Sequence, residues 1–170
     1  MHRFIRVTAL VATLAVMVGF LLTSTSAHEH REIANGQYTV NIGFIHEPAF
    51  VNQQNGLYLR VEKAGTPEAT DASAAATPNA DDHAPGNGVV GLQETLQAEV
   101  IYGDQSMPLP LTPGTELGVY ESVFFPTAVG DYTFHIFGEI EGTAIDETFT
   151  SSPEGFDSVQ AIEDFQFPKP

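Results

Sequence analysis

Two histidines stand where an amino-terminal, leader-like segment ends. His28 and His30 follow Ala27 and are separated by a single glutamate. A signal peptidase that cuts after Ala27 would leave a free amine on His28 and place His30 at the third position of the mature chain. An amine and two imidazoles are nitrogen donors that suit Cu(II) and related divalent ions. The sequence therefore predicts a divalent-metal site at the mature amino terminus.

Two coordination modes are open to such a terminus. In the first, the amine, two deprotonated backbone amides and the His30 ring form a square plane. In the second, the amine and ring of His28 chelate the metal, and His46 or His135 completes the site. Both modes need deprotonated nitrogens, so binding should weaken as pH falls through about 6.5 and 7.7, the ordinary pKa values of histidine and an α-amine. The alternative is that both histidines are polar residues of a frayed terminus.

The leader has the order of a signal peptide. Arg3 and Arg6 precede an apolar run over 7–22, and small polar residues lead to Ala27. We therefore predict a signal peptide over 1–27 and an extracytoplasmic (periplasmic or secreted) mature chain. Cleavage after Ser26 is an alternative that would move His30 to the fourth position. An uncleaved anchor is another, although the apolar run is shorter than the roughly 20 residues that span a bilayer.

Charge and composition exclude several classes of partner. The chain has 22 acidic and 6 basic residues, and loss of Arg3 and Arg6 with the leader takes its formal charge from −16 to −18. Such a chain repels phosphate backbones and anionic lipids, so we expect no nucleic-acid partner. The absence of cysteine excludes disulfides, zinc–thiolate sites and thiol nucleophiles. No second long apolar run follows the leader, so we expect no membrane span in the mature chain.

Motifs of catalysis are missing from the sequence. There is no Gly-x-Ser-x-Gly elbow, no His-Glu-x-x-His helix and no glycine-rich phosphate loop. Five carboxylates in the last third of the chain offer pairs for acid–base chemistry, but such pairs arise by chance in so acidic a chain: Glu121, Glu139, Glu141, Asp146 and Glu147. We expect a protein that is not an enzyme.

The elements that must position these groups are β-strands. Apolar and polar residues alternate over 37–44 and again over 57–62, after an expected turn at Asn55-Gly56. Further strands are expected over 96–102, 118–125, 131–140 and 143–149, with a proline-broken edge strand around 107–111. Glu141-Gly142 is the expected tight turn between the last two strands. About seven strands joined by polar connections predict an all-β, immunoglobulin-like antiparallel β-sandwich.

Two further segments complete the predicted organisation. Residues 64–87 contain no large apolar side chain and are expected to form a disordered loop insertion. Only two strands precede this loop, too few for a separate core, so 28–170 is predicted to be a single domain. The segment 126–134 matches a tyrosine corner, which would turn Tyr132, Phe134 and Ile136 toward the core and His135 outward.

The chain resembles small extracytoplasmic immunoglobulin-like domains of the YtkA-like and FixH-like families and, more broadly, the periplasmic copper-resistance protein C family. The matching features are Ala27-His28, the strand 38–44, the segment 55–61 and the segment 130–134. The resemblance implies a non-enzymatic exported domain, in some members connected with copper handling. In the copper-resistance family an amino-terminal histidine binds Cu(II), which would be the role of His28. That family also uses a late Asp-x-His motif, and the one such motif here is Asp81-Asp82-His83 in the predicted loop.

The function expected from the sequence is that of an exported, non-catalytic binding module of the cell envelope. Its partner would be Cu(II), another divalent metal ion or an envelope protein. The candidate metal ligands are His28, His30, His46 and His135. One alternative is a structural or protein-interaction domain that binds no metal. A copper-dependent oxidative enzyme is the third.

Overall fold

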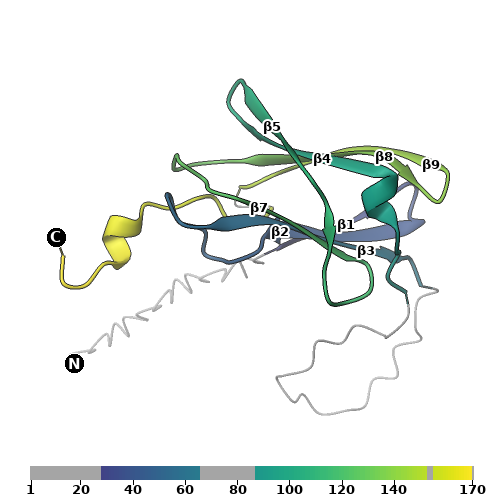
Figure 1. Cartoon of the computed structure of the whole chain (residues 1–170), viewed down its shortest axis with the longest axis horizontal. Coiled ribbons are helices and arrows are strands. Elements are labelled where there is room, and N and C mark those ends of the chain that lie inside the picture. Colours follow the sequence, from purple (N-terminus) through teal and green to yellow (C-terminus); the bar gives the residue numbers. More distant parts are fainter. Residues whose placement is uncertain (1–27, 66–86, 153–154, 170) are drawn as a thin grey trace, which may run out of the picture.

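The computed structural model describes residues 28–65, 87–152 and 155–169 (Figure 1). In these ranges the chain forms nine β-strands and two short 3-10 helices, η1 and η2. The first five strands are β1 (His28–Ile33), β2 (Tyr38–Phe44), β3 (Asn55–Lys63), β4 (Leu96–Tyr102) and β5 (Gln105–Leu109). The others are β6 (Thr112–Pro113), β7 (Val119–Phe124), β8 (Thr133–Ile140) and β9 (Thr143–Thr150), and the helices are η1 (Leu92–Glu94) and η2 (Ile162–Phe165). No helix in these ranges is long and apolar enough to cross a membrane.

The strands form two antiparallel sheets stacked face to face (Figure 1). One has the order β1-β2-β3-β7-β6 and the other β5-β4-β8-β9. With β2 taken as the first strand, this is the strand order of an immunoglobulin-type sandwich. The predicted all-β sandwich is confirmed, with β1 and the two-residue β6 in addition to the strands that the sequence predicted.

The core lies between the sheets, where the alternating apolar residues of both sheets meet. Its centre is Phe44 of β2, which is fully buried. Four aromatic rings surround the Phe44 ring at centroid distances of 5.5–6.2 Å: Phe124, Tyr132, Phe134 and Phe156. Phe156 belongs to the C-terminal segment, which the sequence pattern left unplaced. That segment packs along the sandwich, because Gly130 and Val159 bond to each other's backbone and Val51 donates to the Gln160 carbonyl.

Two predicted turns are confirmed. The Tyr132 hydroxyl donates to the Ala128 carbonyl oxygen at 3.0 Å, which is the hydrogen bond of a tyrosine corner. Glu141 and Gly142 both have positive φ angles, 49° and 84°, as a two-residue hairpin turn requires. The resulting register turns Phe134 and Ile136 inward and His135 outward.

The Asn55-Gly56 pair does not form the expected turn and instead begins β3. The buried Asn55 side chain accepts the His46 backbone N–H at 3.0 Å and donates to the His46 carbonyl at 2.8 Å. The local preference of Asn-Gly for turns is thus overridden by a contact nine residues away.

The expected leader over 1–27 and most of the expected loop over 64–87 lie outside the described residues. The ends of the loop are described. The Lys63 N–H donates to the Asn87 carbonyl at 2.9 Å, and Glu62 forms a bridge with Gly88. The chain therefore leaves and rejoins the sandwich at neighbouring points.

Candidate functional site

His28 is the first residue of β1, an edge strand that pairs with β2 and places His28 opposite Gly43. Its half-buried ring lies 4.8 Å from the Tyr58 ring of β3, centroid to centroid. Burial lowers the pKa of His28 below its ordinary value, and a hydrogen bond with the Phe44 backbone opposes this shift. The neutral imidazole, which is the form that binds metals, is therefore favoured.

His30 lies on the same face of β1 as His28, because side chains two residues apart on a strand point the same way. It is exposed, and it is separated from His28 by about 7 Å of strand. A side chain on the opposite face of β1 connects the strand to the other sheet. Arg31 lies over the Phe149 ring of β9 at 3.9 Å and donates to the Thr148 carbonyl at 2.7 Å. His28 and His30 thus belong to an ordered strand.

The hydrogen-bond pattern of β2 decides which backbone groups of β1 are occupied. The Ile45 N–H donates to Gly56 of β3, so odd-numbered residues of β2 point toward β3 and even-numbered ones toward β1. Ile42 is even-numbered and pairs with Glu29, whose backbone therefore belongs to the ladder. Square-planar coordination would need the Glu29 amide and would break the ladder. Chelation by the amine and ring of His28 would not.

Glu47, which no sequence motif marked as a candidate ligand, follows β2 at the end of the sheet where His28 lies. Its Oε1 accepts the Phe44 N–H at 3.2 Å, and its Oε2 is buried without a hydrogen-bond partner in the described part of the chain. Burial raises the pKa of Glu47 to about 7; the hydrogen bond from Phe44 opposes this shift, and the charge of Asp157 adds to it. The only sequence signal was its place just after a strong strand.

His46 and His135 lie apart from each other. His46 is exposed in the loop after β2, at the same end of the sheet as His28, and Asn55 holds its backbone. His135 lies on the outer face of the other sheet, where its ring stacks on Phe137 at 4.7 Å. The structure therefore does not bring His135 to His28.

Both nitrogens of the His135 ring are bonded to carboxylates. Nδ1 lies 2.9 Å from Glu99 Oε1 on β4, and Nε2 lies 2.7 Å from Asp146 Oδ1 on β9. The hydrogen bond to Glu99, followed by that to Asp146, raises the pKa of His135 above its ordinary value. The three side chains form a clip across three strands of this sheet.

This clip makes stability depend on pH. Folding raises the pKa of His135. The stabilisation given by the protonated ring is therefore fully present below about pH 6.5, and it is lost as the pH rises through the pKa of the folded state. We expect His135→Gln to cost up to about 1 kcal/mol of unfolding free energy at pH 5.5 and almost nothing at pH 9. Urea unfolding of both proteins at the two pH values measures this. A cost that is the same at both would show that the protonated ring contributes nothing.

Within 28–65, 87–152 and 155–169, no group of three or more histidine, aspartate or glutamate side chains is arranged to hold a metal ion. A metal at His28 would therefore need a donor from outside this set. The predicted cleavage after Ala27 would release such a donor, the amine of His28, beside the two imidazoles on one face of β1.

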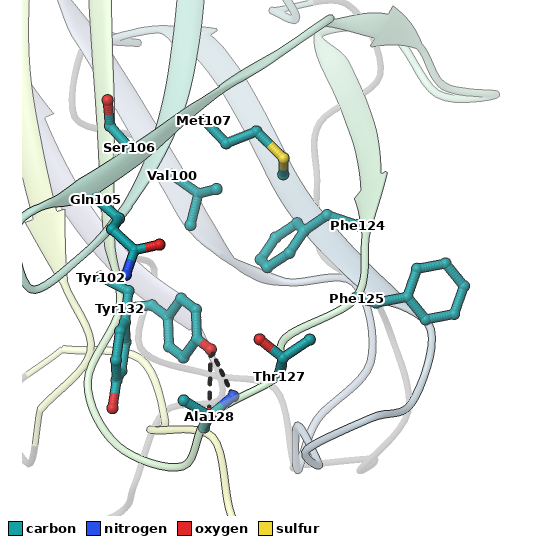
Figure 2. Close-up of a pocket in the computed structure, with 10 residues that line it drawn as sticks. All are labelled: Val100, Tyr102, Gln105, Ser106, Met107, Phe124, Phe125, Thr127, Ala128 and Tyr132. Atoms are coloured by element: carbon teal, nitrogen blue, oxygen red, sulfur yellow. Dashed lines mark hydrogen bonds between the residues drawn. The ribbon is translucent and has the colours of Figure 1, made fainter.

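A separate feature is a pocket of about 290 Å³ at the side of the sandwich (Figure 2). Its walls come from β4, β5, β7 and the β7–β8 connection, and they contain no charged side chain: Val100, Tyr102, Gln105, Ser106, Met107, Phe124, Phe125, Thr127, Ala128 and Tyr132. Figure 2 shows the Phe124 ring pointing into the pocket and the Phe125 ring pointing away. The Tyr102 hydroxyl donates to the Val129 carbonyl at 2.9 Å, which ties this wall to the β7–β8 connection. Met107 and Phe125 are 44% and 59% exposed.

Comparison with known proteins adds no assignment: no protein-family model matches the chain, and no curated protein matches it significantly in sequence.

Proposed function

We propose that this protein is an exported, non-catalytic binding module whose mature amino terminus binds Cu(II). The amine and ring of His28 chelate the metal, and His30 supplies a second imidazole. The observation that carries the proposal is that His28 lies in an ordered strand, with its ring packed on Tyr58 and its strand paired with β2. Donors held in this way bind a metal with little ordering cost.

The donor set and the charge of the chain favour Cu(II) among divalent ions. Nitrogen donors bind Cu(II) more strongly than the other first-row divalent metals, and a tetragonal nitrogen and oxygen site suits it. The formal charge of −16 raises the local concentration of cations.

The non-catalytic part of the proposal is supported by the ion pairs of the carboxylates. Asp146 is bonded to His135, Glu141 lies 2.6 Å from Lys63, and Glu147 lies 3.7 Å from Arg31. The hydrogen bond from Lys63 lowers the pKa of Glu141, and a carboxyl group with a lowered pKa is a poor general acid at neutral pH.

Calorimetric titration of Cu(II) into the protein that begins at His28 tests the proposal. We expect one-to-one binding at pH 7.5, weakened roughly 100-fold by His28→Ala and roughly tenfold by His30→Ala. His135→Ala is the matched control, because it removes a histidine from the other sheet and should leave the affinity unchanged. Equal affinity of the wild type and His28→Ala would refute the proposal.

The pocket in Figure 2 favours a second candidate function, that of a protein-interaction domain. A pocket whose walls are aromatic and uncharged polar side chains accepts an apolar side chain of a partner. Since the chain is strongly acidic, the partner segment would carry basic residues around that side chain.

Two peptides distinguish this function from non-specific charge attraction. A phenylalanine flanked by lysines should shift the NMR signals of Met107 and Tyr102, and the same peptide with alanine should not. Phe124→Ala would disturb the core, so the exposed Met107→Ser is the informative variant and should abolish the shifts. Equal shifts with both peptides would exclude the pocket as a specific site.

A further inference from the structure

The end of the sandwich that carries the pocket in Figure 2 also carries exposed apolar side chains from several elements. Met107 and Phe125 are exposed at the pocket itself, and Val129 is exposed in the β7–β8 connection, which lines the pocket. Phe165 and Phe167 are exposed in the C-terminal segment. A group of exposed apolar side chains marks an interaction surface, whereas single scattered ones do not.

The loop after β2 connects the pocket to the C-terminal segment. The Asn52 N–H donates to the Pro126 carbonyl oxygen at 2.7 Å, directly beside the pocket-lining residue Thr127. Two residues before Asn52, the Phe50 ring packs on the Phe165 ring at a centroid distance of 4.9 Å. The pocket and the C-terminal segment therefore lie at the same end of the molecule. Figure 1 shows this segment extending beyond the sheets.

Residues 161–169, which we call the tail, follow the last backbone hydrogen bonds between the C-terminal segment and the sandwich. Those bonds belong to Gln160, which donates to the Ala49 carbonyl at 2.8 Å and accepts the Val51 N–H at 3.0 Å. Phe167 is 97% exposed. The seven residues from Gln160 to Phe167 span up to about 23 Å when extended. Phe167 is therefore within reach of a neighbouring molecule.

The pocket and the tail are complementary in size and charge. A cavity of about 150 Å³ holds a benzene molecule, so the pocket of about 290 Å³ accommodates a phenylalanine ring. Asp104 is exposed in the β4–β5 turn and directly precedes Gln105, which lines the pocket. Lys169 lies two residues after Phe167 and is the only lysine or arginine of the sequence after β3. The tail thus offers the apolar side chain and the cation that this pocket selects.

We propose that the chain associates with a second copy of itself through its tails, with Phe167 of each copy in the pocket of the other and Lys169 beside Asp104. The molecule's own tail is not in its pocket, since Phe165 packs on Phe50 and Phe167 is exposed. Because pocket and tail lie at one end, two copies that meet end to end exchange tails about a twofold axis, which closes the assembly.

This inference rests on the second candidate function, because it names the partner of the pocket, and it is independent of the copper site. The contact is small, and interfaces that bury less than about 1,200 Å² are typically weak. At the low micromolar concentrations of unfolding experiments the protein should therefore be monomeric, and Phe167 should not contribute to its unfolding free energy.

Sedimentation velocity of the protein that begins at His28 tests the self-association. EDTA excludes bridging by metals, and about 0.15 M salt screens the repulsion between acidic copies beyond about 8 Å. We expect monomers at about 10 µM and mainly dimers at about 1 mM. Phe167→Ser should weaken the association at least about 30-fold.

Leu117→Ser is the matched control and should not change the association. Leu117 is also exposed, but it precedes Gly118, whose carbonyl accepts the Val61 N–H near the other end of β3. A wild type that stays monomeric over this range would overturn the proposal, as would equal association of the wild type and Phe167→Ser.

A mixing experiment tests whether the tail enters the pocket. Met107 is the only methionine after the predicted leader, so methyl labelling of methionine gives one NMR signal, which comes from the pocket. The labelled protein is Phe167→Ser, which keeps the pocket. Unlabelled Met107→Ser, which keeps the tail, should shift the signal, and the double variant Met107→Ser/Phe167→Ser should not. Equal shifts with both unlabelled proteins would overturn the placement of Phe167.

The lysine-flanked phenylalanine peptide separates this inference from the second candidate function. If the peptide shifts the Met107 signal and the Met107→Ser protein does not, the pocket accepts another partner and the proposed self-association is wrong. If neither shifts it, both proposals fail. A Met107 signal that differs between the wild type and Phe167→Ser to the same extent at all concentrations would place the tail in its own pocket and would also overturn the proposal.

Discussion

Replacement of Phe44 by alanine is expected to lower the free energy of unfolding by about 3–5 kcal/mol. Phe44 is fully buried, and its ring touches aromatic side chains from β7, β8 and the C-terminal segment. Its removal would leave a cavity that stiff neighbouring rings cannot fill. It would also loosen the backbone that His28 and Glu47 share.

Urea unfolding measures this loss directly. Phe167→Ala is the control, because Phe167 is 97% exposed and its truncation should change the unfolding free energy by less than about 0.5 kcal/mol. A loss below about 1 kcal/mol for Phe44→Ala would mean that the aromatic cluster does not hold the two sheets together.

Replacement of Gly138 by alanine should cost about 3 kcal/mol, from backbone strain and a steric clash together. Gly138 lies within β8 at a φ of 124°, and a Cβ there would come within 2.3 Å of the Thr95 carbonyl oxygen. The backbone cannot move away easily, because the next residue, Glu139, donates its N–H to the same oxygen at 3.1 Å.

Gly103→Ala separates the two contributions. Gly103 also has a positive φ of 61°, but a Cβ there would meet no atom within 4 Å. Gly103→Ala should therefore lose only the unfolding free energy that is due to backbone strain, about 1 kcal/mol. Equal losses in the two variants would show that the approach to Thr95 relaxes and that the clash has no consequence.

The sandwich could be predicted from the sequence because the residue patterns that specify its strands lie within short segments. Strands β2, β4, β8 and β9 alternate apolar and polar residues within one short segment, which sets their inward faces. The tyrosine corner likewise depends on a contact between Ala128 and Tyr132, four residues apart. Such patterns can be recognised in a short segment without knowledge of the rest of the fold.

What the sequence pattern missed depends on distant partners. β1 carries charged residues on its inner face, and it forms a strand because Arg31 reaches Phe149 on the other sheet. Phe156 is buried only because the C-terminal segment returns to the Phe44 cluster. The turn expected at Asn55 is displaced for the same reason, since its amide binds the backbone of His46.

The candidate site could be predicted in part. The spacing of His28 and His30 predicted two donors close together, and β1 places them on one face. No pattern indicated that His135 would be held by Glu99 and Asp146 on the other sheet. Glu47 carried no motif, and only its hydrogen bond from the Phe44 N–H holds it at the end of β2.

The central claim is that the free amine of His28 is part of a Cu(II) site, and one titration tests it most directly. Cu(II) is titrated at pH 7.5 into the protein that begins at His28 and into the same protein with an acetylated amine. The account predicts one-to-one binding that weakens at least about 100-fold on acetylation, because a chelating donor is lost. Equal affinity of the two proteins, or no binding by either, would contradict it.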